Sequence, residues 1–402
     1  MVNNKPERTL KDLDLAQLFR AESGRILAIL VSECRAIQLA EDALQDACIQ
    51  ATQQWPIEAP RNQVAWLLNA SRRRVIDRLR TASRQHNLNA LHIESVEATD
   101  TELECEQEIP DERLKLIFTC CHPSLNQNAQ VALTLKAVCG LSTLEIARAY
   151  LRSETAMQQR LVRAKNKIRS AGIFYKVPEG EDLTARLESV LTTIYLIFNE
   201  SYSAYSGQSL TREDLGDEAI RLAKVLYRLL PEPEVGGLLA LMLLHQSRHS
   251  SRSSEHDEFV PLQYQDRANW DQEKISLGRR ILLACLSQNR VGKYQLQAAI
   301  SALHAEAANW DETDWQQIQL LYAELYQHMP SPIVKLNGIL AMAHQGKIAK
   351  AMEYLKPIET ELDNYQPFYA AKADLHTKLG QNEEAKHCYQ QAINMSLSLI
   401  HI

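Results

Sequence analysis

The segment from Leu141 to Arg169 carries the side chains best suited to binding a polyanion. Ser142 and Ser153 each precede a helical pattern, where a serine caps a helix by accepting a backbone N–H. Two capped helices with a turn at Leu151 between them predict a helix-turn-helix. The second helix has one apolar face and one face of amides and cations: Gln158, Gln159, Arg160, Arg163, Lys165, Lys167 and Arg169. Such a face has the chemistry to bind the base edges and phosphates of DNA.

The predicted recognition helix divides into two parts by the kind of contact it offers. Residues near the N-terminal end of such a helix reach base edges, and later cations lie on phosphates. The predicted base or groove contacts are Glu154, Thr155, Gln158 and Gln159. The predicted phosphate contacts are Arg160, Arg163, Lys165 and Lys167. The alternative interpretation is a solvated amphipathic face that binds nothing.

A second basic cluster lies on a helix predicted from Val64 to about Ser83. Six arginines there stand against one acid, Asp77: Arg72, Arg73, Arg74, Arg78, Arg80 and Arg84. Trp55 and Trp66 flank the cluster, and aromatic rings beside cations can stack on unpaired bases while the cations hold phosphates. This arrangement suits melted DNA. The alternative is that the aromatic rings belong to the core, and for Trp66 core packing is the favoured role.

Helices must position these residues, and the composition favours helices throughout the chain. The 402 residues exceed one compact domain, and Ala, Leu, Gln, Glu and Arg dominate long stretches. Helical patterns run from Leu13 to about Arg84 and from Asp111 to Arg169. Seven acidic residues between Glu94 and Glu108 indicate a solvated linker, and Gly172 to Gly180 indicates a second boundary. We therefore predict an all-α protein of several domains.

The C-terminal part contains a possible internal repeat. Three pairs of residues recur at about 34 residues, the tetratricopeptide period: Gly346 with Gly380, Ala351 with Ala385, and Leu355 with Tyr389. Each unit is predicted to form a helix, a glycine turn and a second helix, and Trp315 to Pro330 could belong to a degenerate unit. The alternative is an ordinary array of helical hairpins.

Other features of the sequence exclude several classes of protein. The eight cysteines contain no C-x-x-C pair, which is typical of a reducing compartment. Cys120, Cys121 and His122 lack a second ligand pair, so we expect buried thiols near a turn at Pro123 and no metal or cofactor. We find no catalytic motif and expect no enzyme. No apolar run approaches a membrane span, so we expect a cytoplasmic protein without a membrane partner.

The amino-acid sequences of these segments resemble those of a known family. AEDALQDACIQATQQWP and AWLLNASRRRVIDRLR resemble the polymerase-binding and −10 region of the extracytoplasmic-function group of the sigma-70 family. DERLKLIFTCCHPSLNQNAQVALTLKAVCGLSTLEIARAYLRSETAMQQRLVRAKNKIR resembles its −35-binding domain. LGDEAIRLAKVL, GLLALMLLHQSR and the repeat-like tail resemble the subgroup with a tetratricopeptide-like C-terminal extension. The resemblance covers nearly the whole chain.

The resemblance implies roles for individual residues. Asp42, Gln45 and Asp46, on a helix from Gln38 to Gln53, would dock on the clamp coiled coil of core RNA polymerase. The loop from Trp55 to Asn62 would hold a flipped base of the −10 element. The helix beginning at Ser153 would enter the major groove at −35, near the polymerase flap. The residues implied to contact DNA next to the −10 element are Arg72, Arg73, Arg74 and Arg78.

The resemblance also implies a domain order and a function. Residues 1–85 would form sigma region 2, 86–110 the acidic linker, 111–172 sigma region 4 and 182–402 the helical extension. Such a protein would recruit core polymerase to specific promoters and help melt them. Apart from the resemblance, the seven acidic residues of the linker suggest the hypothesis that it occupies the RNA path of polymerase in place of transcript. A repeat array presents a concave surface for a protein partner, so the extension could hold the two DNA-binding domains or contact polymerase itself, and we predict that it regulates activity and is needed for it.

Two other function classes are compatible with parts of the sequence. A one-component helix-turn-helix regulator with a repeat-type sensor domain would bind palindromic DNA as a dimer, without polymerase. A helical scaffold would bind a partner through its repeats, and its basic helices would be incidental. Dependence of DNA binding on core polymerase would separate both classes from a sigma factor.

Overall fold

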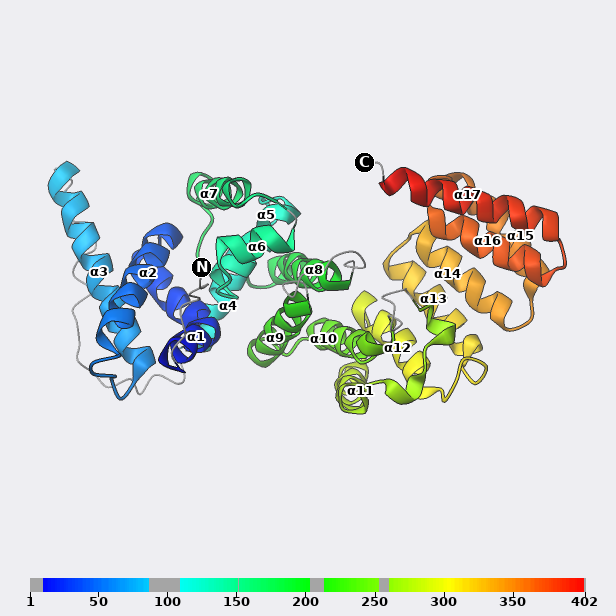
Figure 1. Cartoon of the computed structure of the whole chain (residues 1–402), viewed down its shortest axis with the longest axis horizontal. Coiled ribbons are helices and arrows are strands. Elements are labelled where there is room, and N and C mark those ends of the chain that lie inside the picture. Colours follow the sequence, from blue (N-terminus) through cyan, green and yellow to red (C-terminus); the bar gives the residue numbers. More distant parts are fainter. Residues whose placement is uncertain (1–9, 87–108, 151, 203–212, 253–259, 401–402) are drawn as a thin grey trace, which may run out of the picture. The chain divides into compact units, whose positions relative to one another are not determined.

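Every regular element that the structure describes is a helix, as the sequence predicts (Figure 1). The computed structural model describes residues 10–86, 109–150, 152–202, 213–252 and 260–400. Residues 87–108 of the predicted acidic linker, and Leu151 of the turn predicted at Leu151 to Arg152, therefore lie outside the described residues. The chain divides into two compact units, Met1–Leu229 and Leu230–Ile402. No helix in the described part has the length and apolar character needed to cross a bilayer.

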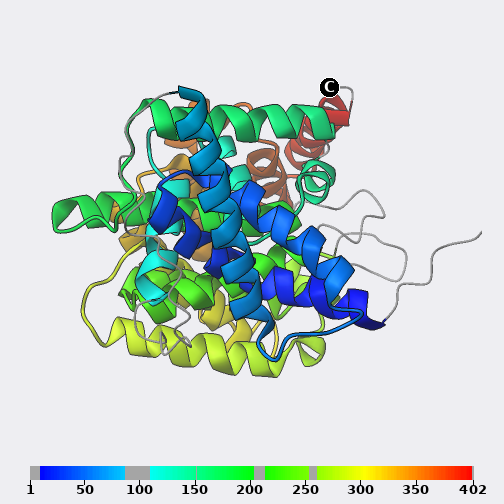
Figure 2. The ribbon, with the colours of Figure 1, turned by 90° about the vertical axis from the view of Figure 1, so that its left-hand side faces the viewer.

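Three helices begin the first unit: α1 (Leu10–Cys34), α2 (Ile37–Gln54) and α3 (Gln63–His86). Figure 2 turns this end of the molecule towards the viewer. α2 packs against both neighbours through a buried face that is rich in small side chains: Ile37, Ala40, Ala43, Leu44, Ala47 and Ala51. Small residues at these positions bring the helix axes close together. Both helices predicted here are present, with ends within about three residues of the predicted ones.

Four further helices follow: α4 (Ile109–Cys120), α5 (Gln127–Ala137), α6 (Thr143–Ala149) and α7 (Glu154–Ser170). α5 is buried on nearly its whole circumference and contacts α4, α6 and α7. The predicted pair of helices around a short turn is therefore present as α6 and α7. α5 is the buried helix against which α6 and α7 both pack.

Two long helices complete the first unit, α8 (Glu181–Tyr202) and α9 (Glu213–Leu229). Both pack on α4, and α8 also packs on α5. Arg186 Nη2 donates to the Phe118 carbonyl at 2.8 Å, and Ser189 Oγ donates to the Cys121 carbonyl at 2.7 Å. The predicted boundary from Gly172 to Gly180 thus precedes two helices that remain part of the first compact unit.

The second unit begins with α10 (Pro233–Gln246), α11 (Gln272–Leu286), α12 (Lys293–Glu306) and α13 (Trp315–His328). α10 is apolar on all sides and lies buried against α11 and α12. In the described residues between α10 and α11 lie short 3-10 helices at His249–Ser251, Leu262–Tyr264 and Arg267–Asn269. The C-terminal half of the unit is built on this buried helix and its neighbours.

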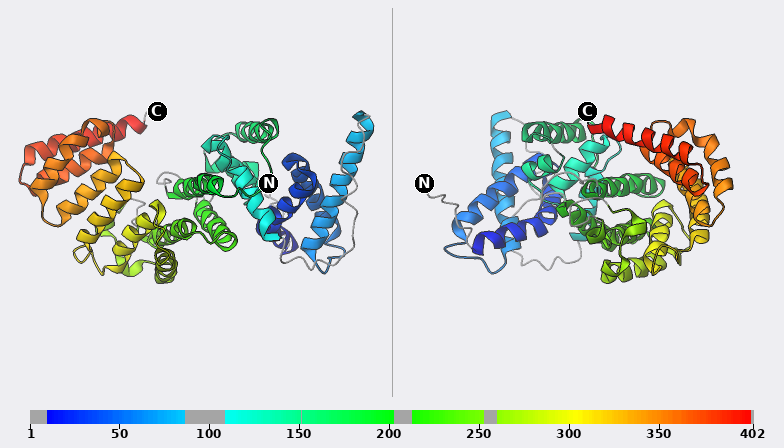
Figure 3. Two further views of the ribbon diagram at one scale, coloured as in Figure 1. Left: turned by 180° about the vertical axis from the view of Figure 1, so that it is seen from behind. Right: turned by 45° about the vertical axis from the view of Figure 1, so that its right-hand side comes forward.

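The second unit ends in two helical hairpins: α14 (Pro332–His344) with α15 (Ile348–Leu355), and α16 (Gln366–Lys378) with α17 (Asn382–Ile400). The 3-10 helices Lys356–Ile358 and Thr360–Leu362 join them. The turn glycines of the two hairpins, Gly346 and Gly380, have φ angles of 83° and 74°. The matching alanines Ala351 and Ala385 are both buried. The predicted units of helix, glycine turn and helix are thus confirmed, and Figure 3 shows them from two sides.

Candidate nucleic-acid interface

Two serines fix the start of both helices of the helix-turn-helix, as predicted. Ser142 Oγ accepts from the Glu145 backbone N–H at 3.1 Å, and Glu145 Oε2 accepts from the Ser142 N–H at 2.7 Å. This reciprocal capping box starts α6. Ser153 Oγ accepts from the Ala156 N–H at 3.2 Å and starts α7. The two caps therefore place the first residues of α7 next to the turn.

α7 has one buried and one exposed face. Met157, Leu161, Ala164 and Ile168 form the buried stripe, which packs on α5 and α6. Most of the predicted DNA contacts lie on the exposed face: Ser153, Glu154, Thr155, Gln158, Gln159, Arg163 and Lys167. Arg160 and Lys165 are half-buried. The amides and most cations of this helix are thus free to meet a ligand.

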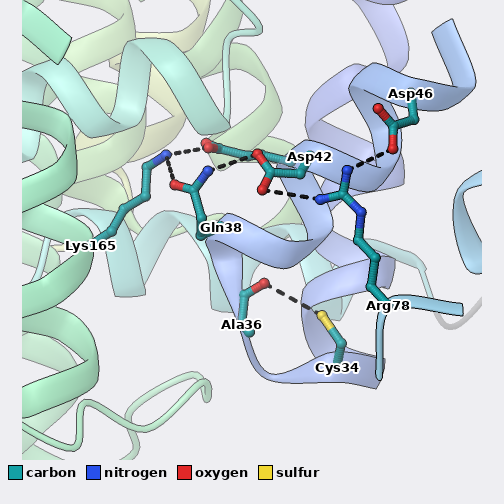
Figure 4. A network of polar contacts seen from close by, with 8 residues as sticks. Cys34, Ala36, Gln38, Asp42, Asp46, Arg78 and Lys165 are labelled. Carbon is teal, nitrogen blue, oxygen red and sulfur yellow. Dashed lines mark hydrogen bonds and ion pairs between the residues drawn. The ribbon is translucent and has the colours of Figure 1, made fainter. Parts of the chain in front are cut away.

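Lys165 already has partners within the first unit. Its Nζ donates to Gln38 Oε1 at 2.8 Å and forms an ion pair with Glu41 Oε2, both on α2 (Figure 4). The Lys165 and Glu41 side chains are only 12% and 13% exposed. A cation predicted to bind DNA phosphate therefore contacts the helix that carries the predicted polymerase-binding residues.

The arginines of α3 fall into two groups. Arg72 pairs with Glu33 of α1 through Nε at 2.9 Å. Arg78 pairs with Asp42 at 3.2 Å and Asp46 at 2.7 Å, both on α2. Among the arginines of this cluster whose side chains the structure describes, Arg73, Arg74 and Arg80 are exposed. The six arginines expected to hold DNA are thus not equivalent, because two of them also join α3 to its neighbours.

The three residues predicted to bind polymerase share one side of α2. Gln45 is exposed, while Asp42 and Asp46 are partly exposed at 38% each. Asp42 Oδ1 accepts from Gln38 Nε2 at 2.7 Å, in addition to its pairing with Arg78. Both carboxylates are held in fixed positions by these bonds and still present part of their surface to solvent.

The turn between α2 and α3 buries one large apolar side chain and exposes another. Trp55 is 8% exposed and meets Trp66 edge to face, with ring centroids 5.6 Å apart. Asn62 Oδ1 accepts from the Ala65 N–H at 3.0 Å and caps α3. Ile57 is 89% exposed. Sequence reasoning missed Ile57, although an apolar residue between two prolines of a polar turn could have drawn attention to it.

The cysteine cluster is internal, as expected. Cys120 ends α4 and Cys121 follows it, both with 0% exposure, and Cys121 Sγ lies 3.4 Å from Thr134 Oγ1. Burial raises the pKa of the Cys121 thiol to about 11. His122 Nδ1 accepts from the Ser124 N–H at 3.1 Å in the following turn. In the described part of the chain no group of three metal-ligating side chains occurs.

Comparison with known proteins assigns families to these helices. Residues 18–85 match Sigma-70 region 2, residues 115–168 match Sigma-70, region 4, and residues 186–286 match a Family of unknown function (DUF6596). An uncharacterized protein of Rhizobium meliloti (strain 1021) is 39% identical over 377 residues, which cover 92% of this chain and 89% of that protein. No solved structure matches the chain. The first two matches contain the basic faces of α3 and α7, and the third begins within α8.

Proposed function

Because the chain belongs to the sigma-70 family, as an extracytoplasmic-function-like member with a C-terminal extension, we propose that it directs core RNA polymerase to specific promoters and helps melt them. Proteins of this family are transcription initiation factors rather than enzymes, and their partners are core polymerase and promoter DNA. The observation that carries the proposal is the capped recognition helix α7, whose exposed face holds amides first and cations later. This order suits a helix that enters the major groove.

In region 2, we assign polymerase binding to Asp42, Gln45 and Asp46. Their shared position on α2 and their partial exposure support docking on a basic or polar surface such as the clamp coiled coil. We assign the flipped −10 base to the turn from Trp55 to Asn62. Since the Trp55 ring is buried, the 89% exposed Ile57 is the large apolar side chain that this turn offers to a base.

In region 4, the −35 element is proposed to bind the first two turns of α7. Ser153, Glu154, Thr155, Gln158 and Gln159 are all exposed there. The later cations are proposed to bind DNA phosphates: Arg160, Arg163, Lys165 and Lys167. The flap of core polymerase is proposed to lie near the same domain. Cations on phosphates supply affinity without sequence information, whereas the amides supply specificity.

The remaining parts of the chain are proposed to regulate initiation. Residues 86–110 would occupy the RNA path of polymerase through their acidic side chains, and residues 182–402 would be needed for activity. The helical hairpins of the extension support binding of a protein partner, because such arrays present continuous surfaces. All of these events take place in the cytoplasm, where polymerase and the chromosome are.

In vitro transcription with purified core polymerase and a library of promoter fragments tests the proposal. Start sites that appear only when the protein is present would support it and would also reveal the −35 and −10 sequences. A footprint from the protein alone, without polymerase-dependent initiation, would instead support a one-component regulator. If the protein gave no polymerase-dependent transcript and no footprint of its own, that result would contradict both functions.

A further inference from the structure

α8 meets region 4 with a row of polar side chains. Arg186, Ser189 and Thr193 are spaced three and four residues apart, so they share one side of the helix. The match to the family of unknown function begins at the first of them. Buried apolar side chains lie between and beside them: Leu187, Val190, Leu191 and Ile194. The first helix of the segment of unknown function thus carries hydrogen-bonding groups into an apolar contact with region 4.

Gln130 of α5 receives two of these side chains. Its Oε1 accepts from Thr193 Oγ1 at 3.1 Å and from Ser189 Oγ at 3.3 Å. Its Nε2 donates to the His122 carbonyl oxygen at 2.9 Å and to the Leu125 carbonyl oxygen at 3.0 Å. Both donors and both lone pairs of this amide are used, and Gln130 is only 4% exposed. A buried amide satisfied in this way holds its partners in one arrangement.

The same side of α8 also binds the backbone where α4 ends. Arg186 Nη2 donates to the Phe118 carbonyl oxygen at 2.8 Å, and Ser189 Oγ to the Cys121 carbonyl oxygen at 2.7 Å. Thr193 Oγ1 lies 2.8 Å from the Ser189 carbonyl oxygen, so each hydroxyl proton is shared between two acceptors. The last carbonyls of a helix have no partner within it. α8 therefore caps α4 and orients the start of α5 in one contact.

The orientation of α5 matters because the recognition helix α7 packs its buried stripe on α5 and α6. At its other end, α8 approaches this helix pair directly. Burial raises the pKa of Tyr150 at the end of α6, Glu200 of α8 raises it further, and Arg160 of α7 opposes both effects. The charge of Glu200 therefore acts at the end of α6, beside a cation of the recognition helix.

We propose that α8 positions the −35 recognition helix, with Ser189, Thr193 and Gln130 as positioning residues that do not themselves touch DNA. The proposal rests on the sigma-factor function proposed above and gives a role to the first helix of the segment of unknown function. Side chains that read base edges must be held to within roughly 0.5 Å and 10–20°. With the start of α5 fixed, α7 keeps one angle to the groove, and the amides of its first two turns meet the bases together.

Isosteric variants separate this role from simple support of the fold. Thr193→Val keeps the shape and removes one hydroxyl, and Ser189→Ala removes the other. The double variant therefore deletes both bonds to Gln130 Oε1 and retains the apolar packing. Val190→Ala removes buried methyl groups from the same turn of α8 and deletes no side-chain hydrogen bond, so it is the matched control for lost stability.

The measurement is the −35 specificity ratio of the holoenzyme. It is the affinity for a promoter fragment divided by the affinity for the same fragment with a scrambled −35 element, at one salt concentration. We expect the double variant to lower this ratio about fivefold, which is about the discrimination of one base contact. Val190→Ala should lower the melting temperature and leave the ratio unchanged. Thr193→Ser, which keeps a hydroxyl, should retain the ratio that Thr193→Val reduces.

Binding is measured at a temperature where circular dichroism shows every variant folded. If the double variant does not fold, Thr193→Val alone carries the test, with an expected loss of about twofold or more. The corresponding ratio for a scrambled −10 element should be the same in all variants, because region 2 is untouched.

An unchanged −35 ratio in the double variant would overturn the proposal. An equal loss in Val190→Ala would also overturn it, and so would a loss in Thr193→Ser as large as that in Thr193→Val. Failure of the sigma function is distinguishable, because the unmodified protein would then give no polymerase-dependent transcript and the proposal would fall with it. A normal transcript with unchanged ratios would refute the positioning role alone.

Discussion

At the scale of single residues, neighbouring cations in one basic cluster have different surroundings. Arg73 and Arg74 are exposed, whereas Arg72 is bonded to Glu33 and Arg78 to two aspartates. Exposed arginines can release counterions from DNA at little cost. Paired arginines must first give up a protein partner, so under the proposed function the same residue type would serve stability at one position and DNA binding at the next.

Substitution of the exposed arginines should change the salt dependence of promoter binding. Arg73→Ala and Arg74→Ala are each expected to reduce the salt slope of binding by about 1 and to leave the melting temperature unchanged. Arg72→Ala is the comparison, since it leaves Glu33 unpaired and should lower the melting temperature. Holoenzyme binding across a salt series measures the slope. Equal salt slopes in all three variants would contradict the distinction between exposed and paired arginines.

Ile57 should matter for melting rather than for folding. Its side chain is 89% exposed, so Ile57→Ala should change the free energy of unfolding by less than about 0.5 kcal/mol. Open-complex formation, followed by permanganate reactivity of unpaired thymines, is expected to fall severalfold. Trp55→Ala should instead destabilise region 2, because the ring is buried against Trp66. Normal open complexes in Ile57→Ala would exclude a contact with the flipped base.

At the scale of elements, the stability of a short helix depends strongly on the hydrogen bonds that cap its ends. α6 has only seven residues, so its first turn is a large part of its hydrogen bonding. The Glu145 carboxyl serves both the capping box and Arg20. Burial alone would raise the pKa of Glu145, but the bonds from Ser142 and Arg20 outweigh it, and the pKa is lowered. The carboxylate therefore stays charged at neutral pH.

Removal of the cap should destabilise the helix-turn-helix. Ser142→Ala deletes the side chain that accepts the Glu145 N–H, with an expected cost of about 1 kcal/mol. Urea unfolding followed by circular dichroism measures this change. Ser142→Asp, which can still accept that hydrogen bond, should retain most of the stability. An uncapped variant as stable as the original would show that packing on α5 alone fixes α6.

The helices after region 4 are part of its support. Arg186, Ser189 and Thr193 of α8 bond to α4, α5 or the turn between them, and Val190 and Ile194 are fully buried. A chain that ends near Tyr175 should therefore melt at a lower temperature and expose apolar surface. A chain that ends at Leu229 keeps the first compact unit whole.

The role of the extension should be tested with the longer of these truncations. If residues 230–402 are needed for activity, the 1–229 chain will fold but transcribe poorly. Differential scanning calorimetry of both truncations separates folding from function. Equal melting temperatures for the two would mean that α8 and α9 do not support region 4.

At the scale of the whole molecule, the second compact unit contains buried histidines that make its stability dependent on pH. Burial, followed by nearby cations, lowers the pKa of His245 and of His304 to about 3. His245 Nε2 lies 3.1 Å from Ser301 Oγ, and His304 stacks on Trp310 and meets Trp315 edge to face. Both rings are neutral in the folded state, whereas they ionise near pH 6.5 when unfolded.

Acidification should therefore destabilise this unit. Between about pH 6.5 and pH 3 the unfolded state binds more protons, so stability falls by up to about 2.7 kcal/mol per pH unit for two histidines. Thermal unfolding from pH 7.5 to pH 5 measures the slope. His304→Asn should reduce the slope by about half, while His387→Asn, an exposed residue of α17, should leave it unchanged.

The sequence by itself determined the helices and the exposed face of the candidate recognition helix. Helix positions followed from apolar periodicity, and Ser142 and Ser153 as caps and Gly346 as a turn followed from local chemistry. These features depend on residues only a few positions apart, so they are visible in the linear order. The exposed face of α7 followed in the same way, because one helical period fixes both faces.

Tertiary structure alone decided which partners those residues meet. Lys165 finds Glu41 across a separation of 124 residues, and an acidic chain offers many other carboxylates. Trp55 is buried because α2 and α3 fold over it, whereas Gln53, Gln54 and Ile57 beside it in the sequence are exposed. α8 belongs with region 4 because apolar faces join by shape and area, which no periodicity records. Helical order is a local property, whereas the choice of partner is set by packing between distant segments.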